Sequence, residues 1–164
     1  MALQISIKTH QSLQQLATEI RALLNLPPFT DKSFAGSPYC QFETLGMIVL
    51  VQCTEEEERD PEVIEYPYCF NIQFSFNEHT LDTDEMEYNL QPYYAQLLAF
   101  HLNVVTACYE KKQVGRHWQV RYRYFHKNPT WDGSILYGEI GWEPAVIASP
   151  PTPWRTMMPS AFSQ

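Results

Sequence analysis

Tyr68-Cys69-Phe70-Asn71-Ile72-Gln73-Phe74-Ser75-Phe76 alternates without a break between large apolar side chains and small or polar ones. A strand points successive side chains to opposite faces of a sheet, so this stretch predicts a strand with one apolar and one polar face. The same alternation recurs over residues 117–124. Together the two strands predict a sheet that is covered on one face and open on the other. We expect the apolar set of the first strand to lie in the core: Tyr68, Phe70, Ile72, Phe74 and Phe76.

Length and charge narrow the class of protein. A chain of 164 residues is normally one domain and can bury a substantial core. Its 19 acidic residues against 11 lysines and arginines give a net charge of −8. That charge disfavours general nucleic-acid binding, because phosphate requires cations. It is typical of a soluble protein, or of one whose partner is basic.

Hydrophobic spacing predicts the other elements. Leu13, Leu16, Ala17 and Ile20 form one apolar stripe on a helix, which Pro27-Pro28 ends. The expected order is a strand at 3–7, a helix at 13–24, a loop at 31–38, strands at 39–44 and 47–53, an acidic loop at 54–66, the strand at 68–76, a second acidic stretch at 80–89, a helix from Pro92 to Leu102, strands at 104–109 and 117–125, and one short strand within 135–147.

This order predicts an α+β fold: a mainly antiparallel sheet with two helices on one face and an extended, proline-rich C-terminal tail. We expect one domain over residues 1–148 and the tail over residues 149–164. Four prolines between Pro150 and Pro159 disfavour regular structure in the tail. Its apolar residues, among them Trp154, predict that it packs on the body or on a neighbouring chain, with a free partner-binding arm as the alternative.

The sequence shows neither a targeting signal nor a membrane span. The N-terminus lacks the basic and then apolar run of a signal peptide, and the aliphatic run from Met47 to Val51 is too short to cross a bilayer. We therefore expect a cytoplasmic protein that does not bind membranes. Its cysteines, Cys40, Cys53, Cys69 and Cys108, should be buried free thiols, with a Cys40 to Cys53 disulfide as an open alternative.

The motifs of the common enzyme classes are absent. The sequence holds no GxGxxG, GxxxxGK[ST], GxSxG, HExxH or CxxC, and its histidines lack the spacing of metal ligands on one helix. We expect no catalytic residue, metal or cofactor. His101 should be a packed core histidine. A nucleophilic pair of Cys108 with a distant histidine is the alternative that stays open.

Twelve acidic residues fall between Glu55 and Glu87. A solvated charge run is one interpretation of them, and a recognition surface for a basic partner is the other. The residues that we assign to partner binding are Glu55, Glu56, Glu57, Glu58 and Asp60.

A basic patch follows later in the chain. His117, Arg121 and Arg123 lie on the polar face of the strand predicted at 117–125, opposite Trp118 and Tyr122. If the helices cover the aromatic face, the arginines meet water or a ligand, and they are candidates for an anion or ligand site. Cross-strand pairing with glutamates is the alternative.

The layout over residues 3–126 resembles that of small bacterial immunity-type proteins. The resemblance rests on the first helix, on the hairpin around Leu45-Gly46-Met47-Ile48-Val49-Leu50, and on Tyr93-Tyr94-Ala95-Gln96-Leu97-Leu98-Ala99 before a strand. Such proteins are acidic α+β inhibitors that neutralise a basic toxin. The resemblance includes no diagnostic motif and transfers no functional residue.

Three functions follow from these patterns. The first is a non-catalytic cytoplasmic protein-binding module, an immunity-type inhibitor of a basic partner. The second is a small-molecule binder or enzyme that uses the open sheet face around Arg121 and Arg123. The third is a structural or assembly subunit that uses the C-terminal tail. A protein is the expected partner, and the chain is expected to be a monomer or a homodimer.

Overall fold

The structure, a computed structural model, describes residues 3–74, 83–133 and 145–158. Phe76, residues 135–144 of the predicted short strand and residues 159–164 of the predicted tail lie outside these ranges. The helices and strands are β1 (Leu3–Lys8), α1 (Leu13–Leu24), β2 (Thr30–Phe34), β3 (Ser37–Thr44), β4 (Met47–Cys53), the 3₁₀ helices η1 (Glu56–Glu58) and η2 (Pro61–Val63), β5 (Tyr68–Phe74), α2 (Thr83–Leu102), β6 (Val105–Val114), β7 (His117–Lys127), β8 (Val146–Ala148) and β9 (Arg155–Thr156).

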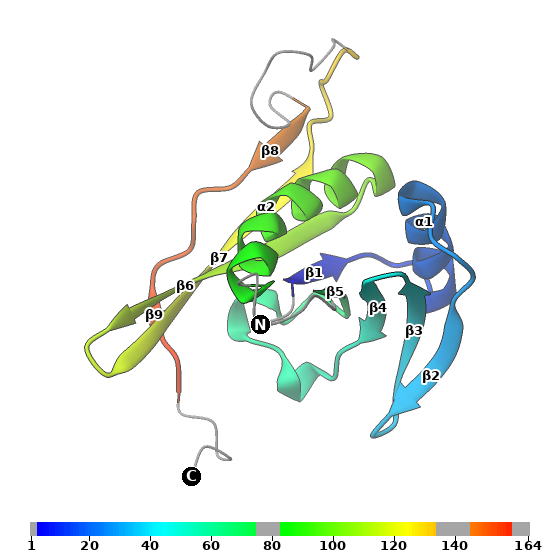
Figure 1. The fold of residues 1–164 in the computed structure, drawn as a ribbon. Helices are drawn as coiled ribbons and strands as arrows, with labels where there is room; N and C mark the ends of the chain where they lie inside the picture. Colours follow the sequence, from blue (N-terminus) through cyan, green and yellow to red (C-terminus); the bar gives the residue numbers. More distant parts are fainter. Residues whose placement is uncertain (1–2, 75–82, 134–144, 159–164) are drawn as a thin grey trace.

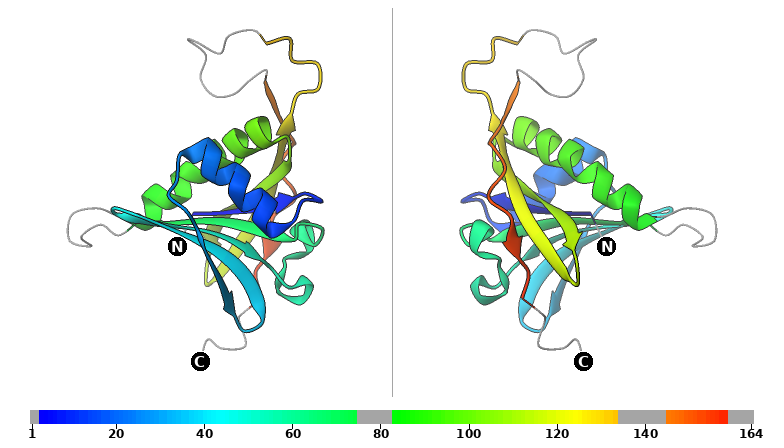
Figure 2. Two further views of the ribbon diagram at one scale, coloured as in Figure 1. Left: turned by 90° about the vertical axis from the view of Figure 1, so that its right-hand side faces the viewer. Right: turned by 90° about the vertical axis from the view of Figure 1, so that its left-hand side faces the viewer.

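One antiparallel sheet organises the described residues (Figure 1). Its strand order is β2-β3-β4-β5-β1-β6-β7-β8, and β9 also pairs with β7. Both helices lie on the same face of this sheet, α1 over β3 and β4 and α2 over β1, β6 and β7 (Figure 2). The α+β class, the antiparallel sheet and the two helices on one face are therefore confirmed.

The core forms where the helices meet the central strands. Leu3 pairs with Ile72 and Ile5 pairs with Phe70 across β1 and β5. These side chains are almost fully buried and join the apolar stripe of α1 in one cluster. Helix α1 begins where predicted, because the Ser12 hydroxyl accepts the backbone N–H of Gln15 in a capping box.

The helix predicted from Pro92 begins at Thr83, so residues 83–89 of the acidic stretch were wrongly placed outside it, and residues 80–82 lie outside the described residues. The buried face of its first half carries Glu87 and Gln91, which hide the apolar spacing of a helix. The Glu87 carboxylate accepts the backbone N–H of Phe74 at 3.1 Å and ties this half to β5. His101, predicted in the core, is exposed near the end of the helix.

A second correction concerns β2, which the sequence predicted as part of a loop. All five of its residues are exposed, so no alternation of apolar and polar side chains marks it as a strand. A two-residue turn at Ala35 and Gly36 joins it to β3. Both turn residues have positive φ, 50° and 86°, as hairpin turns of this length require.

The sheet face opposite the helices is open over only part of its area. Residues 54–67 fold back under β6 and β7 (Figure 2). Val63 and Tyr66 pack there against Val120 and Tyr122 in a second, smaller cluster. The prediction of an open face holds under β3 and β4, where the outward side chains are half-buried, and it is wrong under β6 and β7.

Residues 146–157, here called the strap, run along β7 (Figure 1). After β8, the Ser149 N–H donates to the carbonyl of Tyr124, and the Thr152 N–H donates to the carbonyl of Tyr122. The hydroxyls of Ser149 and Thr152 accept the N–H groups of the same two tyrosines at 2.9 Å each. The strap thus continues the sheet beyond β7 even where it forms no regular strand.

Single substitutions in the core between the helices and the sheet should lower the free energy of unfolding more than substitutions at exposed positions. Phe70 is 0% exposed, so Phe70→Ala should lower the free energy of unfolding by about 3 to 5 kcal/mol through cavity formation. The control Phe34→Ala removes a side chain that is 79% exposed and should change it by less than about 0.5 kcal/mol. Urea unfolding measures both, and similar losses would contradict this placement of the core.

Candidate functional site

Glu55–Glu58, here called the acidic turn, project from the 54–67 segment around η1, and all four side chains are exposed. The Glu55 carboxylate accepts a hydrogen bond from the Ser37 hydroxyl at 3.0 Å, which sets the turn against the start of β3. Within the described ranges, no lysine or arginine of the chain forms an ion pair with these carboxylates.

Arg59 is the cation nearest to the acidic turn in the sequence, and its guanidinium forms hydrogen bonds within residues 54–67. Its guanidinium donates to the carbonyl of Thr54 through Nη2 and to the carbonyl of Ile64 through Nη1, both at 2.6 Å. These bonds hold the two ends of the loop together. Arg59 therefore shapes the acidic turn without forming an ion pair with it.

Asp60, the fifth residue predicted to bind a partner, has a different position. Its carboxylate accepts the Tyr122 hydroxyl at 2.5 Å and lies 3.6 Å from the Arg155 guanidinium. The same guanidinium donates to both carboxylate oxygens of Glu62, at 2.8 and 3.0 Å. We call these four residues the clasp, because they join the 54–67 segment, β7 and the strap. The predicted partner-binding set thus divides into an exposed turn and one residue of the clasp.

A shallow hollow of about 270 Å³ lies on the open part of the sheet beside the acidic turn. Tyr39 lies two residues after Ser37 in β3 and lines the hollow. It pairs with Gln52 near the end of β4. Among the residues that the structure describes, no carboxylate lines the hollow, and its walls combine aromatic, aliphatic and amide side chains: Phe34, Tyr39, Gln41, Ile48, Leu50, Gln52 and Gln73. Sequence reasoning missed this surface, although the alternation of Tyr39 and Gln41 with buried Cys40 and Phe42 marks its face.

Two of the three residues of the predicted anion site, Arg121 and Arg123, approach the same carboxylate, that of Glu110. Arg121 Nε lies 2.6 Å from the Glu110 carboxylate, its cross-strand neighbour, and Arg123 lies 3.9 Å from it. The Arg121 guanidinium also stacks on the Trp154 ring of the strap at 4.4 Å. His117 is exposed at the start of β7. Glutamate pairing, the alternative that the sequence left open, is what the structure shows for Arg121.

Arg121 and Arg123 lie on the opposite face of the sheet from the one that the sequence predicted for them. Phe125, two residues after Arg123, packs in the helix-side core. Arg121 and Arg123 therefore lie on the helix side of the sheet, and the aromatic side chains of β7 lie on the face that residues 54–67 cover. The helices do not cover the aromatic face.

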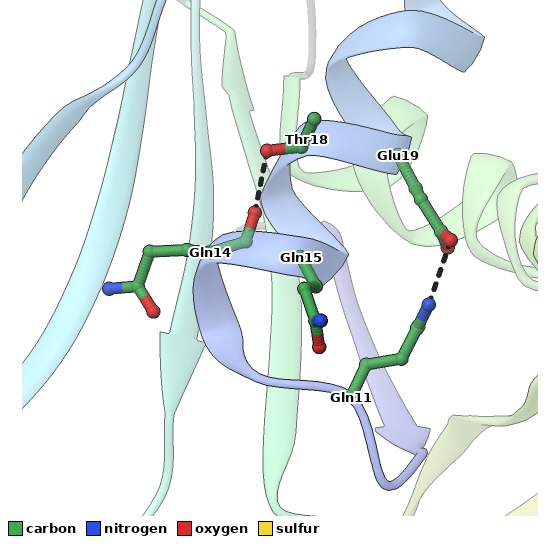
Figure 3. Close-up of a pocket in the computed structure, with 5 residues that line it drawn as sticks. All are labelled: Gln11, Gln14, Gln15, Thr18 and Glu19. Carbon is green, nitrogen blue, oxygen red and sulfur yellow. Dashed lines mark hydrogen bonds between the residues drawn. The ribbon is translucent and has the colours of Figure 1, made fainter.

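A second hollow, about 440 Å³, lies on the outer surface of α1 (Figure 3). Two of its polar groups bond to each other or to the backbone: Gln11 Nε2 donates to the Glu19 carboxylate at 2.8 Å, and the Thr18 hydroxyl donates to the carbonyl of Gln14 at 2.7 Å. The described residues that line it include one carboxylate and no cation, so this hollow offers no evident chemistry.

All four cysteines are free, so the alternative of a Cys40 to Cys53 disulfide is wrong for this structure. Burial raises the pKa of Cys40, Cys69 and Cys108 to about 12, and it also raises the pKa of Cys53. Each is therefore a neutral thiol near pH 7, which gives no support to a nucleophilic Cys108.

The described residues show neither a cluster of metal ligands nor a membrane-spanning helix. In those ranges no three His, Cys, Asp or Glu side chains lie in an arrangement that could hold a metal ion. Neither described helix combines the length and the apolar character needed to cross a bilayer.

Comparison with family models, curated proteins and solved structures gives no match to this chain. The resemblance to immunity-type proteins therefore stays a prediction. Any functional conclusion rests on the acidic turn and the hollow beside it.

The ion pair between Glu62 and Arg155 in the clasp should make the stability of the protein depend on pH. The hydrogen bonds from Arg155 hold the pKa of Glu62 below its usual range. A lowered pKa contributes stability above the unfolded pKa of about 4.3, and this contribution is lost as the pH falls through the folded pKa. We expect Glu62→Gln to cost about 1.5 to 3 kcal/mol near neutral pH, as for hydrogen bonds to charged groups.

The test is urea unfolding of the wild type and Glu62→Gln at neutral pH and near pH 3. The difference between them should shrink at the acidic pH, because protonation of Glu62 removes the charge on which its ion pair with Arg155 depends. Glu65→Gln is the control, because Lys8 also lowers the pKa of Glu65, but on an exposed surface. An equal loss for Glu62→Gln at both pH values would mean that the ion pair does not stabilise the clasp.

Proposed function

We propose that this protein is a non-catalytic binding module that captures a basic partner protein through the acidic turn and the adjoining hollow, in the manner of an immunity-type inhibitor. The observation that carries the proposal is the state of Glu55–Glu58. All four carboxylates are exposed, and no cation of the described residues forms an ion pair with them.

The physical argument has a long-range part and a short-range part. Four adjacent like charges, on a chain of net charge −8, create a field that attracts a cationic surface from about one Debye length, near 8 Å at physiological salt. Such a field mainly raises the rate of association. The hollow beside it supplies the aromatic and aliphatic area that a lasting contact needs.

Several carboxylates elsewhere in the chain form ion pairs. Asp60 and Glu62 interact with Arg155, Glu65 pairs with Lys8, and Glu110 pairs with Arg121. Cations of the chain thus balance these carboxylates and leave the acidic turn unbalanced. This selectivity favours a recognition surface over a general solubilising charge run.

We place this activity in the cytoplasm. The four cysteines are unpaired, although β3 and β4 bring Cys40 and Cys53 onto neighbouring strands. Free thiols are typical of a reducing compartment. The ligand-binding alternative at Arg121 and Arg123 is less favoured, because Glu110 and Trp154 already contact the Arg121 guanidinium.

The partner can be identified by affinity capture from the cells that produce the protein, followed by binding kinetics with the purified partner. The variant Glu56→Gln with Glu57→Gln should slow association about tenfold at low salt, because steering depends on local charge. Its salt dependence should weaken as well. Folding should be unchanged, since both side chains are exposed.

The matched control is Glu19→Gln with Glu65→Gln, which changes the net charge equally but away from the acidic turn. We expect its association rate to stay close to that of the wild type. Equal slowing by both pairs would assign the effect to net charge and would overturn the role of the acidic turn.

A further inference from the structure

Strand β2 forms one end of the sheet, and its outer edge is free within the described ranges. It pairs only with β3, through the register that runs from Thr30–Gln41 to Phe34–Ser37. Every one of its residues is exposed. An edge of this kind presents unpaired backbone groups, which can accept another strand.

The turn geometry identifies those groups. A two-residue turn makes its flanking pair, Phe34 and Ser37, a hydrogen-bonded pair, and such pairs alternate along an antiparallel ladder. Thr30, Lys32 and Phe34 therefore direct their N–H and C=O groups to β3. Asp31 and Ser33 direct theirs outward, which leaves two donors and two acceptors at strand spacing.

The opposite end of the sheet is different. There the strap lies along β7, and the hydroxyls of Ser149 and Thr152 accept backbone N–H groups of that strand. Arg155 of the strap is held by Glu62. The strap thus forms the other end of the sheet with residues that include three prolines, whereas the edge at β2 contains none.

The surroundings of β2 indicate what a further strand would carry. The acidic turn is joined to the end of this hairpin by the bond from Ser37 to Glu55. Lys32 does not block the edge, because its amine points over the sheet to the Gln41 amide at 3.4 Å. Phe34, which is 79% exposed, extends the hollow to the edge itself. A strand with cationic and apolar side chains would complement these groups.

A second copy of the chain fits this edge less well. Full-length antiparallel pairing of β2 with itself places Lys32 opposite Lys32, and like charges directly opposite each other destabilise a sheet. The edge therefore favours a different sequence.

We propose that β2 accepts an extended, positively charged segment of the partner protein as an additional strand of the sheet. This inference rests on the proposed function for the charge of the partner, and it adds the mode of recognition. The backbone of Asp31 and Ser33 would form the ladder, and side chains on one face of the added strand would reach the hollow.

The test uses the full-length protein, labelled with ¹⁵N, and measures amide hydrogen exchange with and without a synthetic octapeptide that alternates lysine and valine. When about nine-tenths of the protein is bound, the amides of Asp31 and Ser33 should exchange about tenfold more slowly, because only the free fraction exchanges. The amides of Thr30, Lys32 and Phe34, already bonded to β3, should change little.

Two controls make the result specific. The same peptide with every backbone nitrogen methylated cannot donate hydrogen bonds to β2 from either edge and should give no protection. Ser33→Pro removes one outward N–H group and should abolish the effect, whereas Ser33→Ala should keep it. An amide spectrum of Ser33→Pro checks that the fold is intact, and the methylated peptide tests the ladder independently of that variant.

The outcomes separate this inference from the proposed function. If the lysine peptide binds and its binding weakens in the Glu56→Gln, Glu57→Gln variant, but Asp31 and Ser33 stay unprotected, strand addition is overturned and the proposed function stands. If a glutamate and valine peptide protects both amides equally well, the preference for a cationic segment is overturned, and with it the proposed function.

Discussion

Leu3, Ile5 and Ile7 of β1 and Phe70 and Ile72 of β5 turn toward the helices and are closed off from water. Burying this surface is the main favourable contribution that the chain can make to folding. It requires both helices on one face, because the centre of the sheet has to be covered along its whole length. The order of the remaining strands follows, since each hairpin can extend the sheet only outward from β1 and β5.

The 54–67 segment then divides the opposite face. Its second half carries Val63 and Tyr66 into the smaller cluster, and its first half exposes the acidic turn. Arg59 joins the two halves through carbonyl groups. A charged surface is thereby held on a segment that is itself anchored in a core, which limits the conformational entropy that a binding partner must remove.

Alternation in β5 and the helical spacing of Leu13, Leu16 and Ile20 were enough to predict the class of fold, because these residues face a single apolar core. Strand β2 and the first half of α2 escaped prediction because their side chains are exposed, or are buried but polar as in Glu87 and Gln91. Only one of the two parts of the candidate site could be predicted from the sequence. Glu55–Glu58 stand out by charge, whereas the hollow depends on Phe34, Ile48 and Leu50, which only strand pairing brings together.

The strap has a consequence for stoichiometry. Pro150, Pro151 and Pro153 carry no backbone N–H, so the outer side of the strap lacks donors at three of its positions. The two ends of the sheet are therefore unequal, since β2 contains no proline, and β2 is the better acceptor of a further strand. Strand addition at β2 alone, as proposed, would give complexes of one chain with one partner and would disfavour growth edge to edge into a filament.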